Sequence, residues 1–364
     1  MQKALMTALS ITHIAAGRDH SLALMSDGEV WGWGAEGSGR INLPSLCSVA
    51  PSSSPIVVPA TMPFARITAG YGTGYGITED HRAYYWGASR AGLAGKTHVM
   101  ATLAAEAVSD LPAVAQLAVS EFYGLARTLD GSVLSWGLTR GGPDSVRNQG
   151  LTPVGLPAPA RHVAVGTGHA LAITDDGLLA WGANGAGQLG VGHLADQREP
   201  VHVPLPADVP LRTAAAGASH SLAINCRGEV WAWGSNQHGQ LGNSFARYSA
   251  KPLRVELDEA IVDIAAGMFF SVALGQSGRV YTWGWNCKGQ LGRGTQGSDA
   301  RPAAIPGLDD IAQIAVGQVH VLAATRHALF AWGDNESSQL GPNGQANRGP
   351  TRPGWSPAPV NLPI

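Results

Sequence analysis

The chain has 364 residues, of which 45% are hydrophobic and only 14% charged, and its formal net charge is −2. Such a balance disfavours nucleic acid and anionic lipid as partners, so we expect no nucleic-acid and no membrane binding. The 48 glycines and 23 prolines are typical of many short strands joined by turns.

The first predicted element is a strand that runs up to Gly17, and the same unit recurs along the chain. In each unit a glycine leads the second strand, and Trp-Gly follows about sixteen residues later. The leading positions are Gly17, Gly70, Ser120, Gly166, Gly217, Gly267 and Gly317. The tryptophans of the Trp-Gly pairs are Trp33, Trp86, Trp136, Trp181, Trp233, Trp283 and Trp332. This period predicts a repeat protein with units beginning near 14, 67, 117, 163, 214, 264 and 314, and we expect residues 1–364 to form one domain.

The unit from 214 to 242 shows what each repeat builds. Leu222 and Ile224 alternate with smaller residues, which is the pattern of a half-buried strand. Asp-Gly pairs such as Asp27-Gly28 predict tight hairpins between the second and third strands. A proline-containing stretch then predicts a fourth strand at the outer edge, because proline cannot donate to a ladder. Seven such units predict an all-β, seven-bladed propeller of four-stranded antiparallel blades.

The two ends of the chain are expected to meet. The chain opens with an Ile-Ala-Ala-Gly strand and finishes with Pro359-Val360-Asn361-Leu362-Pro363. We predict that this terminal strand joins the three strands of the first blade and so closes the ring. The Trp-Gly tryptophans are predicted to fill space between twisted blades rather than to take part in chemistry.

Three sub-motifs recur in fixed order: A-A-G-x-x-H-S-L-A-L, D-G-x-V-W-x-W-G and N-x-x-G-Q-L-G. They are seen at Ala15 to Leu24, Asp27 to Gly34, and Asn184 to Gly190. Together they resemble the repeat of the regulator of chromosome condensation family over essentially the whole chain. The resemblance implies a propeller that uses one face for protein contacts. The family includes an exchange factor for a small nuclear GTPase, a plant ultraviolet photoreceptor and a bacterial β-lactamase inhibitor. The fold alone therefore does not identify the function.

Departures from the family pattern narrow that choice. The photoreceptor type carries tryptophan directly after the leading glycine, whereas these positions here hold Arg18, Tyr71, Glu121, Thr167, Ala218, Met268 and Gln318. Light sensing is therefore not expected. Only Lys3 precedes the first blade as a basic residue, which argues against a chromatin-binding tail. Intervals of 46 to 53 residues between leading positions leave little room for the wedge with which the nuclear exchange factor enters its partner.

Four histidines share one repeat position: His20, His169, His220 and His320. Zinc needs three or four ligands converging on one point, and residues of different blades diverge from such a point. We expect each imidazole to hydrogen-bond nearby backbone instead. The G-x-G-x-x-G match at residues 32–37 overlaps the tryptophan repeat, so it does not predict a dinucleotide site. No catalytic constellation, metal site or cofactor is predicted.

The candidate site consists of unusual residues in two sets of loops, and the resemblance places the first set on the partner-binding face. The loops after the leading glycine contribute Arg18, Asp19, Tyr71, Glu121, Phe122, Met268 and Phe269. The turns after Trp-Gly contribute His238, Trp285 and Asn286. Aromatic and Met side chains on a rim suit hot-spot contacts, although some could fill gaps left by missing histidines. Tyr123 and Phe270 replace the repeat histidine itself and are expected in the core.

Three functions remain open from the sequence. The first is a non-catalytic, protein-binding propeller, favoured as a monomer. The second is a guanine-nucleotide exchange factor for a small GTPase, possibly that of a host. The third is an enzyme that acts on a small molecule at the propeller face or channel.

Cellular location is predicted from the cysteines and the first residues. The three cysteines are odd in number and form no C-x-x-C pair, which favours a reducing compartment. A cleaved signal peptide is not expected, because the first blade already opens at Ile14 to Gly17. We expect a cytoplasmic protein, with specialised export left open. Twenty arginines against four lysines suggest a GC-rich, bacterial genome.

Overall fold

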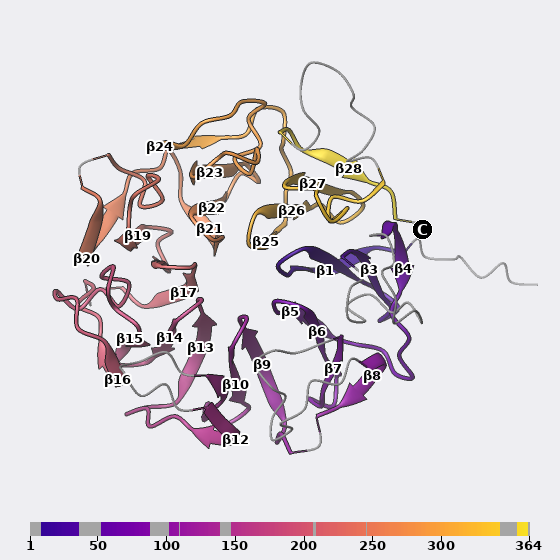
Figure 1. Cartoon of the computed structure of the whole chain (residues 1–364), viewed down its shortest axis with the longest axis horizontal. Coiled ribbons are helices and arrows are strands. Elements are labelled where there is room, and N and C mark those ends of the chain that lie inside the picture. Colours follow the sequence, from indigo (N-terminus) through magenta and orange to yellow (C-terminus); the bar gives the residue numbers. More distant parts are fainter. Residues whose placement is uncertain are drawn as a thin grey trace, which may run out of the picture.

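The computed structural model describes residues 9–35, 52–87, 102–108, 110–138, 147–206, 209–244, 246–342 and 355–362. These residues form seven four-stranded sheets arranged in a ring around a central axis (Figure 1). No α-helix occurs within the described ranges, and none of their segments is a helix that could span a membrane. Cys47 and residues 36–37 of the G-x-G-x-x-G match lie outside these ranges.

Each blade takes four consecutive strands, antiparallel to their neighbours and ordered from the axis outward. Blades 1 to 3 contain β1 (Ile11–Ala16), β2 (His20–Met25), β3 (Val30–Gly34), β4 (Ser52–Val57), β5 (Arg66–Ala69), β6 (Thr73–Ile77), β7 (Ala83–Gly87), β8 (Thr102–Ala107), β9 (Val114–Val119), β10 (Tyr123–Thr128), β11 (Val133–Leu138) and β12 (Arg147–Pro153). Blades 4 and 5 contain β13 (Ala160–Val165), β14 (His169–Thr174), β15 (Gly177–Gly182), β16 (Gln197–His202), β17 (Leu211–Ala216), β18 (His220–Asn225), β19 (Val230–Ser235) and β20 (Tyr248–Val255). Blades 6 and 7 contain β21 (Ile261–Ala266), β22 (Phe270–Gly275), β23 (Val280–Gly284), β24 (Asp299–Ala304), β25 (Gln313–Val316), β26 (His320–Ala324), β27 (Leu329–Gly333) and β28 (Ala358–Val360).

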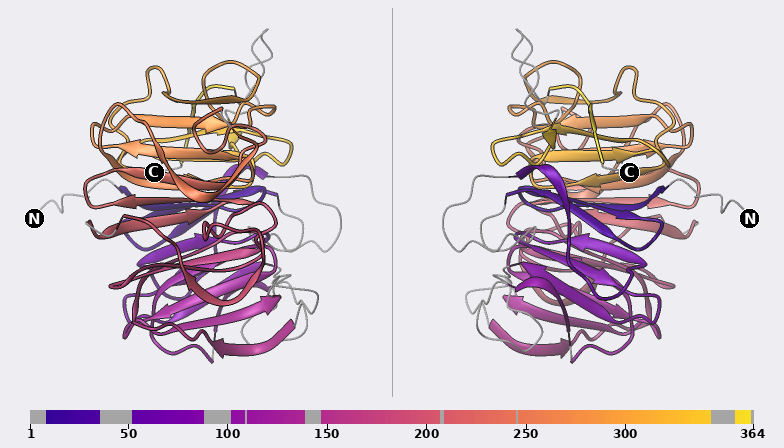
Figure 2. Two further views of the ribbon diagram at one scale, coloured as in Figure 1. Left: turned by 90° about the vertical axis from the view of Figure 1, so that its left-hand side faces the viewer. Right: turned by 90° about the vertical axis from the view of Figure 1, so that its right-hand side faces the viewer.

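The predicted fold class is confirmed, and the strand order gives the ring two distinct faces. The innermost strands all end at the leading glycine position, so the loops after that glycine share one face with the turns after Trp-Gly. We call this the glycine face. The opposite side, which carries the starts of the innermost strands and the Asp-Gly hairpins, is the hairpin face. Side views show the disc formed by the stacked blades (Figure 2).

The predicted ring closure was wrong in its pairing. The terminal strand β28 pairs with β27 of blade 7, while blade 1 has four strands of its own. Each repeat already supplies a complete sheet, so no blade has to be shared between the two ends. Closure comes from packing: Val360 of β28 belongs to the same buried cluster as Ile14 and Trp33 of blade 1. Backbone bonds also join the two blades, including Gln318 N to Gly17 O at 3.3 Å.

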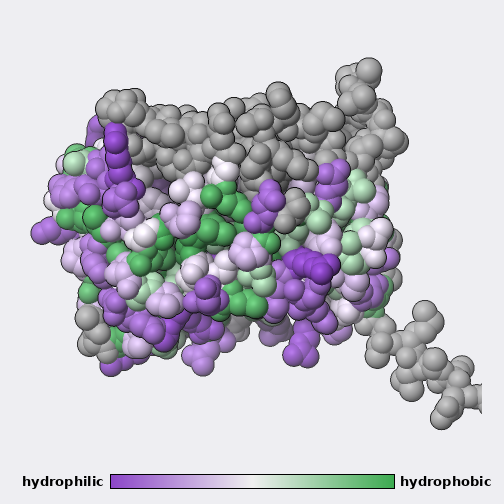
Figure 3. All heavy atoms as spheres, turned by 90° about the horizontal axis from the view of Figure 1, so that it is seen from below, coloured by the Kyte–Doolittle hydropathy of each residue, from purple (hydrophilic) through white to green (hydrophobic). Residues whose placement is uncertain are grey.

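Burial is greatest in the second and third strands of a blade and lower in the innermost and outermost strands, as β17 to β20 show. All six residues of β18 are buried, whereas β16 at the outer edge has none that is fully buried. The prolines of the outer strands, such as Pro200 in β16 and Pro302 in β24, lie at the predicted sheet edges. Seen from the edge below β9 and β12 in Figure 1, the side of the ring displays apolar residues flanked by polar ones (Figure 3). The main core therefore lies between the inner strands of adjacent blades.

The leading glycine is required by the close approach of blades around the axis. A Cβ on Gly217 would clash with the imidazole of His220 and lie 2.5 Å from the carbonyl oxygen of Gly267 in the next blade. At the blade 2 position, where Thr73 replaces the histidine, the nearest contact of a Cβ on Gly70 would be a methyl group at 3.1 Å. The glycine and the histidine of the repeat are therefore one packing unit.

Tryptophans and G-Q-L-G loops connect the blades in a recurring arrangement that we call the interblade latch. Trp233 of blade 5 is fully buried, and its Nε1 donates to the carbonyl oxygen of Gln188 in blade 4 at 2.9 Å. The hydroxyl of Ser221 donates to the same oxygen at 2.8 Å. The tryptophan bond recurs at Trp283–Gln240, Trp332–Gln290 and Trp33–Gln339. The predicted packing role of these tryptophans is confirmed.

The repeat histidines extend the latch. Nε2 of His169 lies 2.9 Å from the hydroxyl of Ser221 in the next blade. Since that hydroxyl already donates its hydrogen to Gln188, the imidazole donates from Nε2. Equivalent pairs are His220–Ser271 and His320–Ser21. The expected backbone partner was thus wrong for His169 and His320, whose acceptor is a hydroxyl of the neighbouring blade. His220 contacts such a hydroxyl as well and also has a backbone hydrogen bond to Phe270. Burial lowers the pKa of His169 and His320 to about 3 and that of His220 to about 4.

Candidate functional site on the glycine face

Four of the predicted site residues meet at the ring axis. Arg18, Tyr71, Glu121 and Met268 line a cavity of about 130 Å³ whose wall is made by the ends of all seven innermost strands. The guanidinium of Arg18 donates to the hydroxyl of Tyr71 and lies 4.5 Å from the centre of its ring. This pair joins blades 1 and 2 across the channel mouth. The cavity is smaller than the roughly 300–1,000 Å³ typical of ligand pockets.

Two further predicted residues flank this mouth without lining it. The carbonyl oxygen of Asp19 accepts the backbone N–H of Ala35 at 2.8 Å and so fixes the start of the loop after Trp-Gly. Phe122 follows Glu121 in the blade 3 loop and is half-buried. Both residues therefore belong to the glycine face.

Three other predicted residues, His238, Phe269 and Trp285, come together in what we call the aromatic cluster. The ring of Phe269 lies 5.3 Å from that of His238 and 6.0 Å from that of Trp285, the latter edge-to-face. The rings of His238 and Trp285 are 6.2 Å apart. All three side chains are half-buried, so each shows part of its surface to solvent. The cluster spans blades 5 and 6, which are neighbours in the ring (Figure 1).

The aromatic cluster is held by the backbone beneath it. The N–H of Trp285 donates to the carbonyl oxygen of Phe269 at 2.9 Å, which ties together the two loops of blade 6. The N–H of His238 donates to Oε1 of Gln240 at 2.9 Å within the blade 5 loop. Because short hydrogen bonds fix these loops, the rings have little freedom to collapse onto one another or to disperse. The arrangement is therefore preorganised.

A polar groove begins beside the cluster. Its volume is about 700 Å³, and it shares His238 with the cluster. The residues lining it are Asn236, Gln237, His238, Gly239, Asn243, Ser244, Ala246, Arg247, Ser298 and Ala300. Most of these residues were missed from the sequence, because the stretch between G-Q-L-G and the outer strand has no motif and meets the next blade only in the folded ring. An apolar centre next to a polar rim is the usual anatomy of a protein interface.

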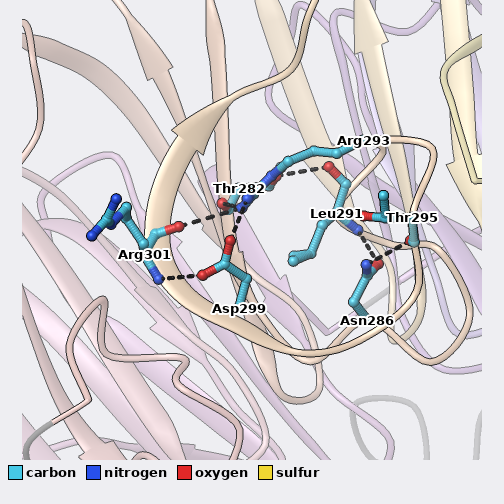
Figure 4. Close-up of polar contacts among 7 residues, drawn as sticks. All are labelled: Thr282, Asn286, Leu291, Arg293, Thr295, Asp299 and Arg301. Carbon is cyan, nitrogen blue, oxygen red and sulfur yellow. Dashed lines mark hydrogen bonds and ion pairs between the residues drawn. The ribbon is translucent and has the colours of Figure 1, made fainter.

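Asn286 has a structural task in the loop that carries Trp285. It is only 1% exposed. Its Oδ1 accepts the N–H of Leu291 at 3.0 Å, and its Nδ2 donates to the carbonyl oxygen of Thr295 at 2.8 Å (Figure 4). Asn184 and Asn236 make the same bond to the leucine of their own G-Q-L-G loops. The Asn286 side chain thus shapes the loop from inside rather than contributing exposed surface.

A half-buried arginine fixes the far side of the same loop. Nη1 of Arg293 lies 2.7 Å from Oδ2 of Asp299, and its Nε donates to the hydroxyl of Thr282 at 3.3 Å (Figure 4). That hydroxyl donates to the carbonyl oxygen of Leu291 at 2.7 Å. Hydrogen bonds to the backbone of Arg301 and to Arg293 lower the pKa of Asp299 against the opposing effect of burial. The loop bearing Trp285 is therefore anchored at both ends.

The two residues expected in the core are there. Tyr123 is 7% exposed, and Phe270 is fully buried in the position of the repeat histidine. The hydroxyl of Tyr123 accepts Nε1 of Trp181 at 3.2 Å, in place of the glutamine carbonyl used by the latch. Burial raises the pKa of Tyr123. Within the described part of the chain, no three His, Cys, Asp or Glu side chains are grouped to hold a metal ion.

Comparison with known sequences identifies the family. The sequence model of the RCC1-like domain matches residues 153–361, and that of the regulator of chromosome condensation repeat matches residues 11–40. The ultraviolet-B receptor UVR8 of Arabidopsis thaliana is 30% identical over 244 residues, which are 64% of this chain and 55% of that protein. The mitochondrial RCC1 domain-containing protein RUG3 of the same plant is 30% identical over 269 residues, 69% of this chain and 60% of that protein. The chain thus spans less than two thirds of the length of these relatives.

Solved structures agree on the fold. Human WBSCR16 superposes with a TM-score of 0.78 at 22% identity, covering 92% of this chain and 94% of that one. Prp20p of Saccharomyces cerevisiae gives 0.75 at 24% identity, covering 84% and 80%. The blade count, the strand order and the sequence match over more than half of the residues lead to one conclusion. This chain belongs to the RCC1-like domain family.

Proposed function

We propose that this protein is a non-catalytic propeller that binds a protein partner through the glycine face of blades 5 and 6. The observation that carries the proposal is the aromatic cluster, in which His238, Phe269 and Trp285 gather from three loops of two blades. Half-buried aromatic rings on a rigid base are the residue types and the setting of interface hot spots. The polar groove beside them supplies a rim for hydrogen bonds.

Protein binding also fits the family. The published description of Prp20p concerns its binding to Gsp1p and histones, so a protein of this fold binds other proteins. Its 24% identity carries the fold alone and names no partner for this chain. Arg18, Tyr71, Glu121, Phe122 and Met268 would extend the same contact surface toward the axis.

Quantitative pull-down with the purified chain tests the proposal. Trp285→Ala and Phe269→Ala should each reduce recovery of the bound protein about tenfold or more, because hot-spot truncation costs ≥2 kcal/mol. Leu129→Ala is the control, since Leu129 is a large apolar residue 55% exposed in the β10–β11 hairpin on the opposite face. Equal recovery by Trp285→Ala and Leu129→Ala would contradict the proposal. A Tyr71→Ala/Phe122→Ala variant then measures how far the surface reaches toward the axis.

Exchange of guanine nucleotide on a small GTPase, possibly of a host, stays the alternative prediction. A fluorescent-nucleotide release assay across a panel of small GTPases measures it directly. Accelerated release that Trp285→Ala abolishes would assign exchange activity to the same face. Absence of release from the whole panel, with partner binding retained, would leave the binding function alone.

We further propose a monomer in a reducing, cytoplasmic setting, with a bacterial source as the compositional prediction. Cys226 and Cys287 are both exposed and unpaired, which suits a reducing compartment. The relatives named above are eukaryotic. Sedimentation of the purified chain should give a single species of about the 37.6 kDa chain mass.

A further inference from the structure

A second hollow opens on the hairpin face, away from the aromatic cluster. It has a volume of about 580 Å³ and lies where the innermost strands of blades 1 to 4 begin. The residues lining it are Thr12, His13, Ala65, Arg66, Ile67, Thr68, Tyr75, Ile77, Ala115, Gln116, Leu117, Arg127, Arg161 and His162. Its volume falls within the range of small-molecule sites, unlike that of the cavity on the glycine face.

The lining of this hollow is cationic. Arg66, Arg127 and Arg161 lie in its wall, and no Asp or Glu does. Arg66 and Arg161 are exposed at the mouth, where Arg161 pairs with Asp175. Nη1 of Arg66 donates to the carbonyl oxygen of Ala115 at 2.9 Å, which leaves its charge without a carboxylate among the described residues. This basic hollow thus occurs in a chain whose net charge is −2.

Arg127 is the unusual member. It replaces an apolar residue of the second strand; the other six blades hold Leu24, Ile77, Ile173, Ile224, Leu274 and Ala324 at this position. Its Nε is buried and has no hydrogen-bond partner within the described ranges. Desolvation, together with the charge of Arg66, lowers the pKa of Arg127. Arg127 as a whole is half-buried, and partial desolvation of a cation next to another cation is unfavourable unless an anion compensates.

The neighbouring groups do not supply that anion. Burial and then Arg66 lower the pKa of His13, while burial and, to a smaller extent, Arg127 lower that of His162. Gln116 uses its amide to bridge to blade 4, donating to the carbonyl oxygen of Val163 at 2.9 Å. Asp263 has in blade 6 the strand position that His13 has in blade 1, but its carboxyl does not line the hollow. The site therefore has donors and positive charge in excess.

We propose that this hollow binds a small ligand that carries phosphate groups, with Arg127 at its base and Arg66 and Arg161 at its mouth. A guanidinium offers a planar fork of donors that matches phosphate oxygens two at a time. Three of them around one hollow suit a dianionic or more highly charged group better than a single carboxylate. The confined shape selects a small molecule rather than an extended polyanion.

Calorimetric titration of the full chain with inorganic pyrophosphate, at low ionic strength, tests the proposal. One site should be seen, and binding should raise the melting temperature. Arg127→Leu restores the apolar residue of the other blades, so it should keep or raise the melting temperature without ligand. It should weaken pyrophosphate binding at least tenfold. Arg66→Gln, at the exposed mouth, should also weaken binding and tests the same site with little risk to folding.

Arg212→Gln is the matched control, because Arg212 is exposed on the same face and does not line the hollow. It should bind pyrophosphate like the wild type. The proposal is overturned if the wild type shows no binding at millimolar pyrophosphate, or if Arg127→Leu and Arg66→Gln both bind as tightly as the wild type. Equal losses from Arg212→Gln would also overturn it, since they would indicate general charge attraction. Succinate binding as tightly as pyrophosphate would overturn the assignment to phosphate.

Discussion

The seven interfaces between blades fall into two groups that differ in how they are joined. At four interfaces, those of blades 4 with 5, 5 with 6, 6 with 7 and 7 with 1, a buried tryptophan donates to a glutamine carbonyl of the preceding blade. At the interfaces of blades 1 with 2 and 2 with 3, the indole nitrogens of Trp86 and Trp136 have no partner among the described residues. Among the described residues, the tryptophan bond thus recurs at four interfaces and is not seen at these two.

This difference also separates the two sites. The aromatic cluster is built on latched blades 5 and 6, whose regular loops hold the rings in place. The cationic hollow lies across blades 1 to 4, on the opposite face, where the described residues show no glutamine latch. There Arg127 replaces the apolar residue that the other six blades have at this position.

The largest effect is expected at the interface between blades 7 and 1, where the ring closes. Deletion of residues 355–364 removes β28 and the buried Val360, which packs in the cluster that closes the ring. We expect the free energy of unfolding to fall by on the order of 5 kcal/mol, from lost apolar burial and an exposed strand edge. Denaturant unfolding measures this loss. Val360→Ala should cause a smaller loss, and a wild-type unfolding curve from the deletion would disprove the closure described here.

The histidines of the latched interfaces make stability depend on pH. Their folded pKa values, about 3 to 4, lie below the usual 6.5, so the unfolded chain binds protons first as the pH falls. Their contribution is complete above about pH 6.5 and is lost progressively toward pH 4. Asp263, whose pKa burial raises to about 6, acts in the opposite sense. From pH 7 to 5 we expect a net loss on the order of 4 kcal/mol.

A variant isolates that pH effect. His220→Gln should reduce the slope of unfolding free energy against pH by about 1.4 kcal/mol per unit between pH 6 and 5. Unfolding in urea at a series of pH values gives the slope. An unchanged slope would mean that His220 is not held neutral in the folded state.

A matched pair of tryptophan substitutions compares the two kinds of interface directly. Trp233→Phe removes the bond to Gln188 and leaves that buried carbonyl with one donor fewer. Trp136→Phe removes an indole nitrogen that has no described partner. Trp233→Phe should therefore cost about 1–3 kcal/mol more than Trp136→Phe in chemical unfolding. Equal costs would show that the latch adds nothing beyond packing.

The smallest effect is expected at the substitute contact between blades 3 and 4. Tyr123→Phe removes the hydroxyl that accepts Nε1 of Trp181 and should cost about 1 kcal/mol. Phe270→Tyr is the reverse change at the same repeat position and should also destabilise, because Phe270 is fully buried beside Gly267. Thermal unfolding of both variants checks the pair. A stabilised Tyr123→Phe protein would contradict the assigned bond.

The sequence predicted the blades because the same local pattern recurs in seven units. Alternation, Asp-Gly turns and prolines each report on one strand or turn, and the structure places them as expected. The pairing of the terminal strand was mispredicted. The period gives the length of each repeat but not the strand at which a blade begins, so it does not say whether the last strand completes blade 7 or blade 1. The partners of the histidines were missed for a similar reason: Ser221 lies 52 residues from His169 and meets it only across an interface.

The candidate sites were predicted unevenly. His238, Phe269 and Trp285 were found separately as departures from the repeat, but their clustering needed the blade spacing. Asn286 looked like a departure as well, although its hydrogen bonds place it with Asn184 and Asn236 as a loop residue. Arg127 could have been noticed from the sequence by aligning the second strands, where it stands among six apolar residues.

The most direct test of the central proposal is the affinity of the captured protein partner for Trp285→Ala beside Leu129→Ala. If the aromatic cluster is the docking site, Trp285→Ala should lower affinity at least tenfold, while Leu129→Ala should leave it unchanged and both variants should unfold like the wild type. Unchanged affinity for Trp285→Ala would contradict a binding function for this face of blades 5 and 6.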